Sequence, residues 1–284
     1  MASFVLSLPW GIGLPRQPNQ YKELERKMTD DDYQALADFF DGYSSGFITR
    51  NANAHPHITK KEHTARVVEN TVFLGKSLGL ARQQMRTAQA AALLHDIGRF
   101  YQFETFGTFS DFASKNHGAL GVGVIREHRL LASCPRVEKR RILRAIALHN
   151  AYQLPFGMDG ETRFLTKLLR DADKLDIFNV VTRKYRAPDP AENGYLTHNL
   201  KDDGQISKTL MDQIFKKQLI NNHQVRSLND LKLLQISWVF DLNFKETIQQ
   251  VDDLGYIPLI LSTMKDPVHL AGLLDFMKAH MTAN

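Results

Sequence analysis

Apolar residues return every three or four positions along most of the chain, and few segments alternate between apolar and polar residues as strands do. This periodicity predicts an all-α protein. One polar break interrupts it, where Pro188 and Pro190 begin a stretch that continues to Gly204. The 284 residues therefore divide into four predicted parts: an N-terminal arm (1–28), a helical domain (29–187), a linker (188–206) and a C-terminal helical extension packed on that domain (207–284).

Capping residues and glycines predict several helix ends. Thr29 precedes three aspartates, which favour the positive end of a helix dipole, so a helix is expected to start there. Thr59 and Glu62 form a T-x-x-E capping box, which predicts a second start and places His63 in a first helical turn. Further helices are expected at 116–131, 136–149, 162–185, 207–220, 228–242, 244–254 and 268–280.

The segment from 80 to 115 is expected to change from helix to loop. Residues 80–96 are rich in good helix formers, and Gly98 predicts the end of that helix. The adjacent residues His95 and Asp96 would then lie at a helix C-terminus. Aromatic and turn-forming residues follow at 99–115, which predicts a packed loop that walls a pocket.

Composition narrows the function classes. The chain is 43% hydrophobic and 24% charged and has no apolar run long enough for a membrane span, so a soluble protein is expected. The single cysteine, Cys134, excludes a cysteine-based metal cluster and favours a reducing cytoplasm. The net charge of +5 suits an anionic partner, but no aromatic residues interleave with the basic stretch at 136–144, so nucleic acid is not expected. Assembly of the chain into a homo-oligomer stays an open alternative.

Histidines and carboxylates occur on or at the ends of the predicted helices. Imidazole and carboxylate groups are the ligands that divalent transition metals accept. Asp171 and Asp176 flank Asp173 beside apolar residues, and an unpaired buried carboxylate is so costly that this cluster requires cations or donors. The candidate ligands are His63 in TKKEHTARV, His95 and Asp96 in AALLHDIGRF, His117 in KNHGALGV, His149 in RAIALHN, and Asp173 in LLRDADKLDIF.

The order of these motifs resembles the signature of the HD superfamily of metal-dependent phosphohydrolases, chiefly through LLHDIGR followed by DADKLD. The likeness covers residues 59–180 and implies an HD-domain helical bundle with additional C-terminal helices. It makes His63, His95, Asp96 and Asp173 the ligands of one ion. His117 and His149 match the extra histidines of members with two metals, in which Asp96 would bridge the ions. The GYP extension typical of cyclic-dinucleotide phosphodiesterases is absent.

The resemblance implies a metal-activated hydroxide that cleaves a small phosphate ester, such as a nucleotide, with Asp96 in the catalytic centre. The ion could be Mn, Fe, Co, Ni, Mg or Zn. Arg99 and Lys174 are expected to contact the phosphate or the leaving group, and so to serve in both catalysis and substrate binding. Two alternatives stay open: a two-iron oxygenase of the same fold, and a nucleotide-sensing module without turnover.

The remaining candidates are given structural interpretations. His55 and His57 flank Pro56 and are expected at the surface, and His128 is expected to be solvated. The aromatic segment SWVFDLNF, at 237–244, is expected to form core rather than a ligand site.

Overall fold

The computed structural model describes residues 27–187, 200–264 and 267–283, and every regular element within these ranges is a helix. The prediction of an all-α HD-type bundle with additional C-terminal helices is confirmed. Residues 1–26 of the predicted arm and residues 188–199 of the predicted linker lie outside the described residues. Within the described residues, no helix has the length and apolar character needed to cross a membrane.

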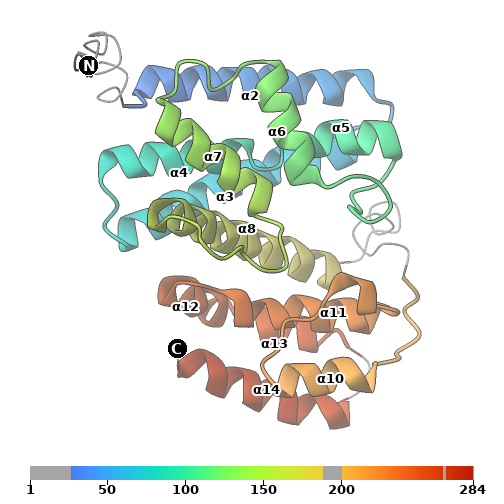
Figure 1. Cartoon of the computed structure of the whole chain (residues 1–284). Helices are drawn as coiled ribbons and strands as arrows, with labels where there is room; N and C mark the ends of the chain where they lie inside the picture. The colour runs from blue at the N-terminus through green and yellow to red at the C-terminus, as the bar shows by residue number, and fades with distance from the viewer. Residues whose placement is uncertain (1–26, 188–199, 265–266, 284) are drawn as a thin grey trace, which may run out of the picture.

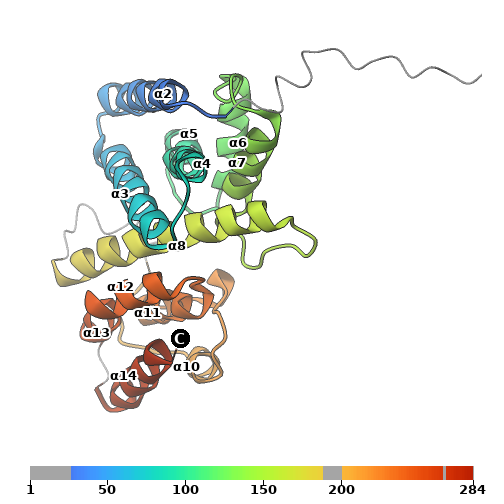
Figure 2. The same cartoon turned by 90° about the vertical axis from the view of Figure 1, so that its left-hand side faces the viewer.

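One long helix, α8 (Gly160–Arg186), lies between two groups of helices (Figure 1, Figure 2). It packs against α3, α4 and α7 on one side and against α12 and α13 on the other. Its N-terminal half contributes Leu168 and Ala172 to the first hydrophobic core, and its C-terminal half contributes Phe178 and Val181 to the second. The two cores therefore meet along a single helix.

The first group surrounds the predicted metal ligands. Thr29 caps its first helix as predicted, because the Thr29 hydroxyl accepts a hydrogen bond from the Asp32 amide at 3.1 Å. Such a cap contributes about 1 kcal/mol. The helices of this group are α2 (Asp30–Arg50), α3 (His55–Ser77), α4 (Arg82–Leu94), α5 (Ile97–Phe106), α6 (His117–Glu127) and α7 (Arg136–Leu148).

The predicted start of α3 was wrong. The helix begins at His55 rather than after Thr59, with Pro56 in its first turn, where a fixed φ and a missing amide hydrogen suit a helix start. The Thr59–Glu62 pair is therefore inside the helix. His63 lies two turns from the N-terminus, which gives its side chain a firmer support than a first turn would.

The prediction that His95 and Asp96 lie at a helix C-terminus is confirmed, because α4 ends at Leu94, but the role given to Gly98 in ending that helix was wrong. Gly98 lies inside α5, which runs through part of the expected loop and ends at Gly107, whose φ is 65°. A Cβ atom on Gly98 would lie 2.5 Å from the His117 carbonyl oxygen and would also meet the Gly121 amide nitrogen. Glycine is required there because the backbones of α5 and α6 approach each other closely.

The second group consists of five α-helices and two 3₁₀ turns within the described residues. One of them, α13, was not predicted, because Gly255 and Pro258 interrupt the helical pattern; Pro258 is tolerated because it lies in the first turn. The group comprises α10 (Lys208–Phe215), the 3₁₀ turn η1 (Asn222–Gln224), α11 (Leu228–Ser237), the 3₁₀ turn η2 (Trp238–Asp241), α12 (Lys245–Asp253), α13 (Tyr256–Leu261) and α14 (Pro267–Thr282).

Candidate metal centre

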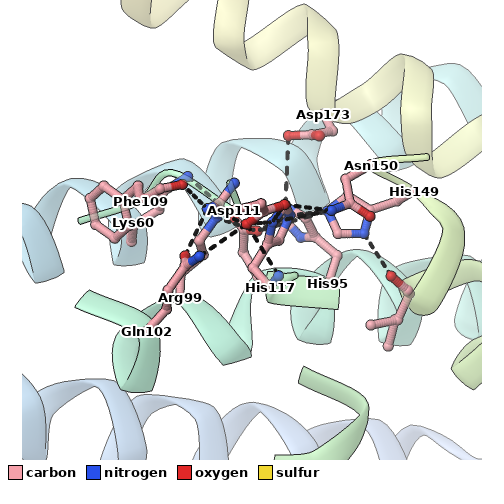
Figure 3. A network of polar contacts seen from close by, with 12 residues as sticks. Lys60, His95, Arg99, Gln102, Phe109, Asp111, His117, His149, Asn150 and Asp173 are labelled. Atoms are coloured by element: carbon pink, nitrogen blue, oxygen red, sulfur yellow. Dashed lines mark hydrogen bonds and ion pairs between the residues drawn. The ribbon is translucent and has the colours of Figure 1, made fainter. Parts of the chain in front are cut away.

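Four histidines from four different elements meet in the interior of the first group. His63 comes from α3, His95 and His149 are the C-cap residues of α4 and α7, and His117 begins α6. All four side chains are buried. The six candidate ligands predicted from the sequence, which are these histidines with Asp96 and Asp173, therefore come together. Figure 3 shows four of them, His95, His117, His149 and Asp173.

Each imidazole is held in one orientation by an acceptor at Nδ1. His95 Nδ1 lies 2.7 Å from the Ala92 carbonyl oxygen, and His149 Nδ1 lies 2.7 Å from the Ile146 carbonyl oxygen. A carbonyl oxygen only accepts, so Nδ1 carries the proton in both rings. Their Nε2 atoms therefore present lone pairs to the centre.

The other two imidazoles are oriented by carboxylates. His63 Nδ1 lies 2.6 Å from Asp176, and His117 Nδ1 lies 2.7 Å from Asp111. A carboxylate at Nδ1 fixes the tautomer and makes Nε2 a stronger ligand for a metal. All four rings consequently offer Nε2.

The Asp96 carboxylate stands between two pairs of histidines. Its Oδ2 atom lies 3.5 Å from His63 Nε2 and 3.7 Å from His95 Nε2. Its Oδ1 atom lies 3.4 Å from His117 Nε2 and 3.8 Å from His149 Nε2. One oxygen therefore faces each pair, as a carboxylate shared by two ions requires.

The distances between ring nitrogens also fit cations. His117 Nε2 and His149 Nε2 are 2.9 Å apart, and His63 Nε2 and His95 Nε2 are 3.3 Å apart. When both rings of a pair are neutral and carry the proton on Nδ1, these contacts bring lone pairs face to face, which a cation between them would stabilise. Asp173 Oδ1, at 3.1 Å from His63 Nε2, adds a negative charge to the first pair. Two groups of side chains lie close enough together that each could hold a metal ion, namely His63, His95 and Asp173, and His95, Asp96 and His149.

The charge states agree with this arrangement. Burial raises the pKa of Asp96, but Lys60, His95 and Arg99 outweigh burial and hold that pKa well below its usual range. Burial also raises the pKa of Asp173, but its close contacts with His63 and His95 outweigh burial, so this pKa is lowered too. Burial and Lys60 lower the pKa of His63, but Asp173 and Asp176 outweigh them and raise it.

The second histidine pair is kept neutral. Burial, followed by the neighbouring His117 and His95, lowers the pKa of His149 to about 3. Burial and Arg99 likewise lower the pKa of His117. A neutral imidazole is the form that binds metal, so these two rings remain competent ligands in weakly acidic solution.

The three carboxylates clustered on α8 have separate partners. Asp173 faces the centre, whereas Asp176 orients His63 and accepts a hydrogen bond from Arg66 Nε at 2.6 Å. Asp171 accepts hydrogen bonds from the backbone amides of Asn243 and Phe244, which ties α8 to the segment before α12. Each carboxylate of the cluster therefore has cations or donors beside it, as expected, but only Asp173 faces the candidate metal centre.

Arg99 and Lys174 both line the cavity beside the centre, and both have protein partners. Arg99 bonds to Gln102 at 2.8 Å and pairs with Asp111, while its Nε lies 3.5 Å from Asp96 and makes no hydrogen bond within the described residues. Lys174 Nζ donates to Asp241 at 2.7 Å. Burial and Arg170 lower the pKa of Lys174, against the opposing effect of Asp241.

Three residues of the site were missed by sequence reasoning. Lys60 Nζ lies 2.8 Å from Asp96 Oδ2, and its position one turn before His63 could have revealed it. The Asp111 carboxylate accepts hydrogen bonds from the side chains of Gln102, His117 and Asn150 (Figure 3). Asp241 forms ion pairs with Arg170 and Lys174. Asp111 reaches the site through a loop and Asp241 through a helical turn that is distant in the sequence, so local sequence patterns predict neither position.

A cavity of about 430 Å³ opens from the centre and lies between the two groups of helices. Tyr152 contributes to closing it, because its hydroxyl donates to the Leu219 carbonyl oxygen at 2.8 Å, from one group to the other. The expectation that SWVFDLNF forms core is confirmed, because Val239 is buried and Trp238 and Phe240 pack against the second core. Trp238 and Asp241 also line the cavity.

Two further histidine interpretations are now settled. The prediction of a surface position for His57 was wrong, since the side chain is 1% exposed and its ring stacks on Phe100. This happens because α3 begins early enough for His57 to pack beneath α2 and α5. His128 is exposed as expected, and its ring also contacts Phe39.

The model of the HD domain family matches residues 61–223, more than half of the chain. The chain therefore belongs to the HD-domain family. Proteins of this family are generally metal-dependent hydrolases. The match extends past the proposed linker at 188–206, so the domain boundary stays a prediction. No curated protein and no solved structure was found to match the chain.

Proposed function

We propose that this protein is a metal-dependent phosphohydrolase that cleaves a small phosphate ester, such as a nucleotide, and that it uses two divalent ions. The observation that carries the proposal is the division of Asp96, which turns one oxygen toward His63 and His95 and the other toward His117 and His149. The proposed ligands are His63, His95 and Asp173 for one ion and His117 and His149 for the other, with Asp96 shared.

The protein supplies order and charge around these ions. Bound divalent ions lower the pKa of a water molecule and stabilise negative charge on phosphoryl oxygen. Arg99 Nε, which has no hydrogen-bond partner within the described residues, is placed to donate to a phosphate oxygen. Lys174 adds a second positive charge at the same end of the cavity. Fixed cations of this kind stabilise charge that develops during phosphoryl transfer.

Removal and return of metal test the proposal. The full chain is treated with chelator, dialysed, and assayed against a nucleotide panel and a generic aryl phosphate after Mn²⁺, Co²⁺, Ni²⁺, Mg²⁺, Zn²⁺ or Fe²⁺ is added. Hydrolysis is expected only after metal is restored, with two ions per chain by elemental analysis. Absence of turnover with every metal and substrate would overturn the proposal. Two irons per chain with an oxygen-dependent reaction would replace it by the oxygenase alternative.

Single substitutions test the two-ion arrangement. His117→Ala is expected to reduce the bound metal from two ions to one per chain, because it removes a ligand of one ion only. His128→Ala is the matched control, since this histidine is exposed and its ring contacts Phe39 rather than the candidate metal ligands. Equal metal content in both variants would contradict the assignment of His117.

A further inference from the structure

The cavity is a channel between two helix faces. Part of its lining recurs at intervals of three and four along α8 and along α11 with η2, which places these residues on one face of each; the rest comes from the metal centre and from the segments 109–111, 149–152 and 219–222. Asp241, at the end of η2, pairs with Arg170 and Lys174 of α8, so the two faces run in opposite directions. The lining residues on these two faces are Arg170, Asp173, Lys174, Ile177, Val180 and Val181 on α8, and Leu231, Leu234, Gln235, Trp238 and Asp241 opposite.

The polarity of this channel changes along its length. The end near Asp173 is charged, whereas the far end is lined by Ile177, Val181 and Leu231. Eight residues of α8 separate Asp173 from Val181, which corresponds to about 12 Å along the helix axis. This length accommodates a phosphate and one further group of moderate size.

The far end contains one buried amide group. Gln235 is 3% exposed, and its Oε1 accepts a hydrogen bond from the Tyr185 hydroxyl at 2.8 Å. Its Nε2 has no hydrogen-bond partner within the described residues, and the residue lines the cavity. Nε2 itself is not fully buried, because it is accessible from the cavity, so it can donate a hydrogen bond to a ligand that carries an acceptor.

An aromatic surface lies one turn from this amide. Trp238 lines the cavity, and its ring packs edge-on against Phe178, with centroids 6.0 Å apart and planes at 65°. Phe178 is fully buried and so limits the movement of the indole. A planar ring of a ligand can therefore stack on a tryptophan whose position is already fixed.

We propose that Trp238 and Gln235 select the organic group of the substrate, which is a planar heterocycle that stacks on Trp238 and accepts a hydrogen bond from Gln235 Nε2. This inference rests on the proposed function, in which the phosphate lies at the metal centre. A nucleoside monophosphate has this chemistry. A plain sugar phosphate would leave Trp238 without contact, and an alkyl phosphate would leave Gln235 Nε2 without an acceptor.

Substrate comparison gives the first test. The metal-loaded full chain is assayed with nucleoside monophosphates, ribose 5-phosphate and hexyl phosphate. At least one nucleotide is expected to exceed the other two esters about tenfold or more in kcat/KM. Trp238→Ala should lower kcat/KM for that nucleotide at least about fivefold, the lower end of the measured range for base stacking, and leave that for ribose 5-phosphate unchanged.

A matched control separates stacking from local disruption. Phe240→Ala removes a ring from the same 3₁₀ turn, but Phe240 packs on His280 with centroids 5.0 Å apart and does not line the cavity. It should leave the preference for the nucleotide intact. Gln235→Leu, a substitution of similar volume, should lower kcat/KM for the nucleotide about 3- to 10-fold without a comparable change for ribose 5-phosphate. Thermal unfolding confirms that each variant is folded.

Binding without metal gives a second and independent readout. Trp10 and Trp238 are the two tryptophans of the chain, so Trp10→Phe makes Trp238 the single reporter of fluorescence. Chelator-treated Trp10→Phe protein should be quenched by at least one nucleoside at millimolar concentration and not by ribose. If nucleotides are hydrolysed no better than ribose 5-phosphate and no nucleoside quenches, the inference fails while the phosphohydrolase stands. If no ester is hydrolysed, the proposed function fails, and quenching alone decides the inference.

Discussion

The two groups of helices differ in the kind of residue that each brings to the cavity. The first group, with α8, holds all six candidate metal ligands, and each imidazole among them is oriented by an acceptor behind it. The second group lines the cavity with apolar side chains and with Gln235, Asn221 and Asn222, and the Gln235 amide is oriented by Tyr185. Chemistry that depends on exact atom positions lies in the rigid, hydrogen-bonded part, and recognition of the organic group lies in the part built by packing.

This difference makes the two functions separable in principle. Changes in the first group should alter metal content and turnover of every substrate. Changes in the second group should alter the choice among substrates and leave the metal in place. The four predictions below test this division, from the largest expected effect to the smallest.

Asp96→Asn should have the largest effect, because it weakens the one carboxylate that faces both histidine pairs. The catalytic contribution of a metal is several kcal/mol, so we expect kcat to fall about 10³-fold or more, with loss of bound metal. Enzyme assay and elemental analysis measure both. Asp41→Asn is the control, because Asp41 is an exposed partner of Lys61. Unaltered metal content and activity in Asp96→Asn would refute every metal-centred interpretation.

Gly98→Ala should destabilise the packing behind the metal ligands. The new methyl group would meet backbone atoms of His117 and Gly121, which cannot move aside as a flexible side chain would. We expect a loss of about 2–3 kcal/mol in the free energy of unfolding, measured with urea. Gly123→Ala on α6 is the control, because nothing lies within 4 Å of its Cβ position. There the gain in helix propensity should stabilise the fold by about 0.5–1 kcal/mol. Equal effects would contradict the close approach of α5 and α6.

Asp176→Asn should weaken metal binding without removing a ligand. Loss of a carboxylate that orients a metal-binding histidine typically costs 10- to 100-fold in affinity, and about that loss is expected by chelator competition. Asp171→Asn offers a comparison on the same helix, since Asp171 is equally buried but binds Asn243 and Phe244 instead. It should lower stability and leave metal affinity unchanged. Equal metal affinity in the two variants would show that Asp176 does not position His63.

Asp241→Asn should have the smallest effect and tests the link between the groups. Asp241 accepts from both Arg170 and Lys174, and Arg170 in turn donates to the His149 carbonyl oxygen at 2.8 Å. We expect a loss of about 1–2 kcal/mol in stability and a few-fold loss in kcat/KM, with metal content unchanged. Asp275→Asn, at an exposed position on α14, serves as the control. Loss of metal in Asp241→Asn would show that the two groups are not separable.

The amino-acid sequence predicted the candidate metal ligands of the first group of helices better than the cavity lining of the second group. The all-α class, the cap at Thr29 and the convergence of the six candidate ligands were predictable, because helix periodicity and short motifs are local properties of the chain. Their role as metal ligands stays a prediction. Trp238 and Asp241 could not be found in this way, because they reach the cavity only through the docking of α11 and η2 on α8.

The errors have an equally physical cause. Gly98 looked like a helix end because glycine commonly ends helices, yet here it permits the close approach of the α5 and α6 backbones. His57 was expected at the surface because it stands beside Pro56 in a predicted loop, yet aromatic side chains of α2 and α5 cover it. In both residues a tertiary contact determines the environment, and a single sequence carries no direct record of that contact.

The continuity of α8 has a consequence for how this protein can change over evolutionary time. Asp173 and Val181 belong to one uninterrupted helix, so the spacing between them is set by helical rise and cannot be adjusted by a hinge. Inserting a single residue between them would rotate everything beyond it by about 100° and turn the far lining away. Acceptance of a longer or shorter ligand must therefore arise from substitutions on the opposing helices, where side chains can be exchanged one at a time while the metal ligands keep their register.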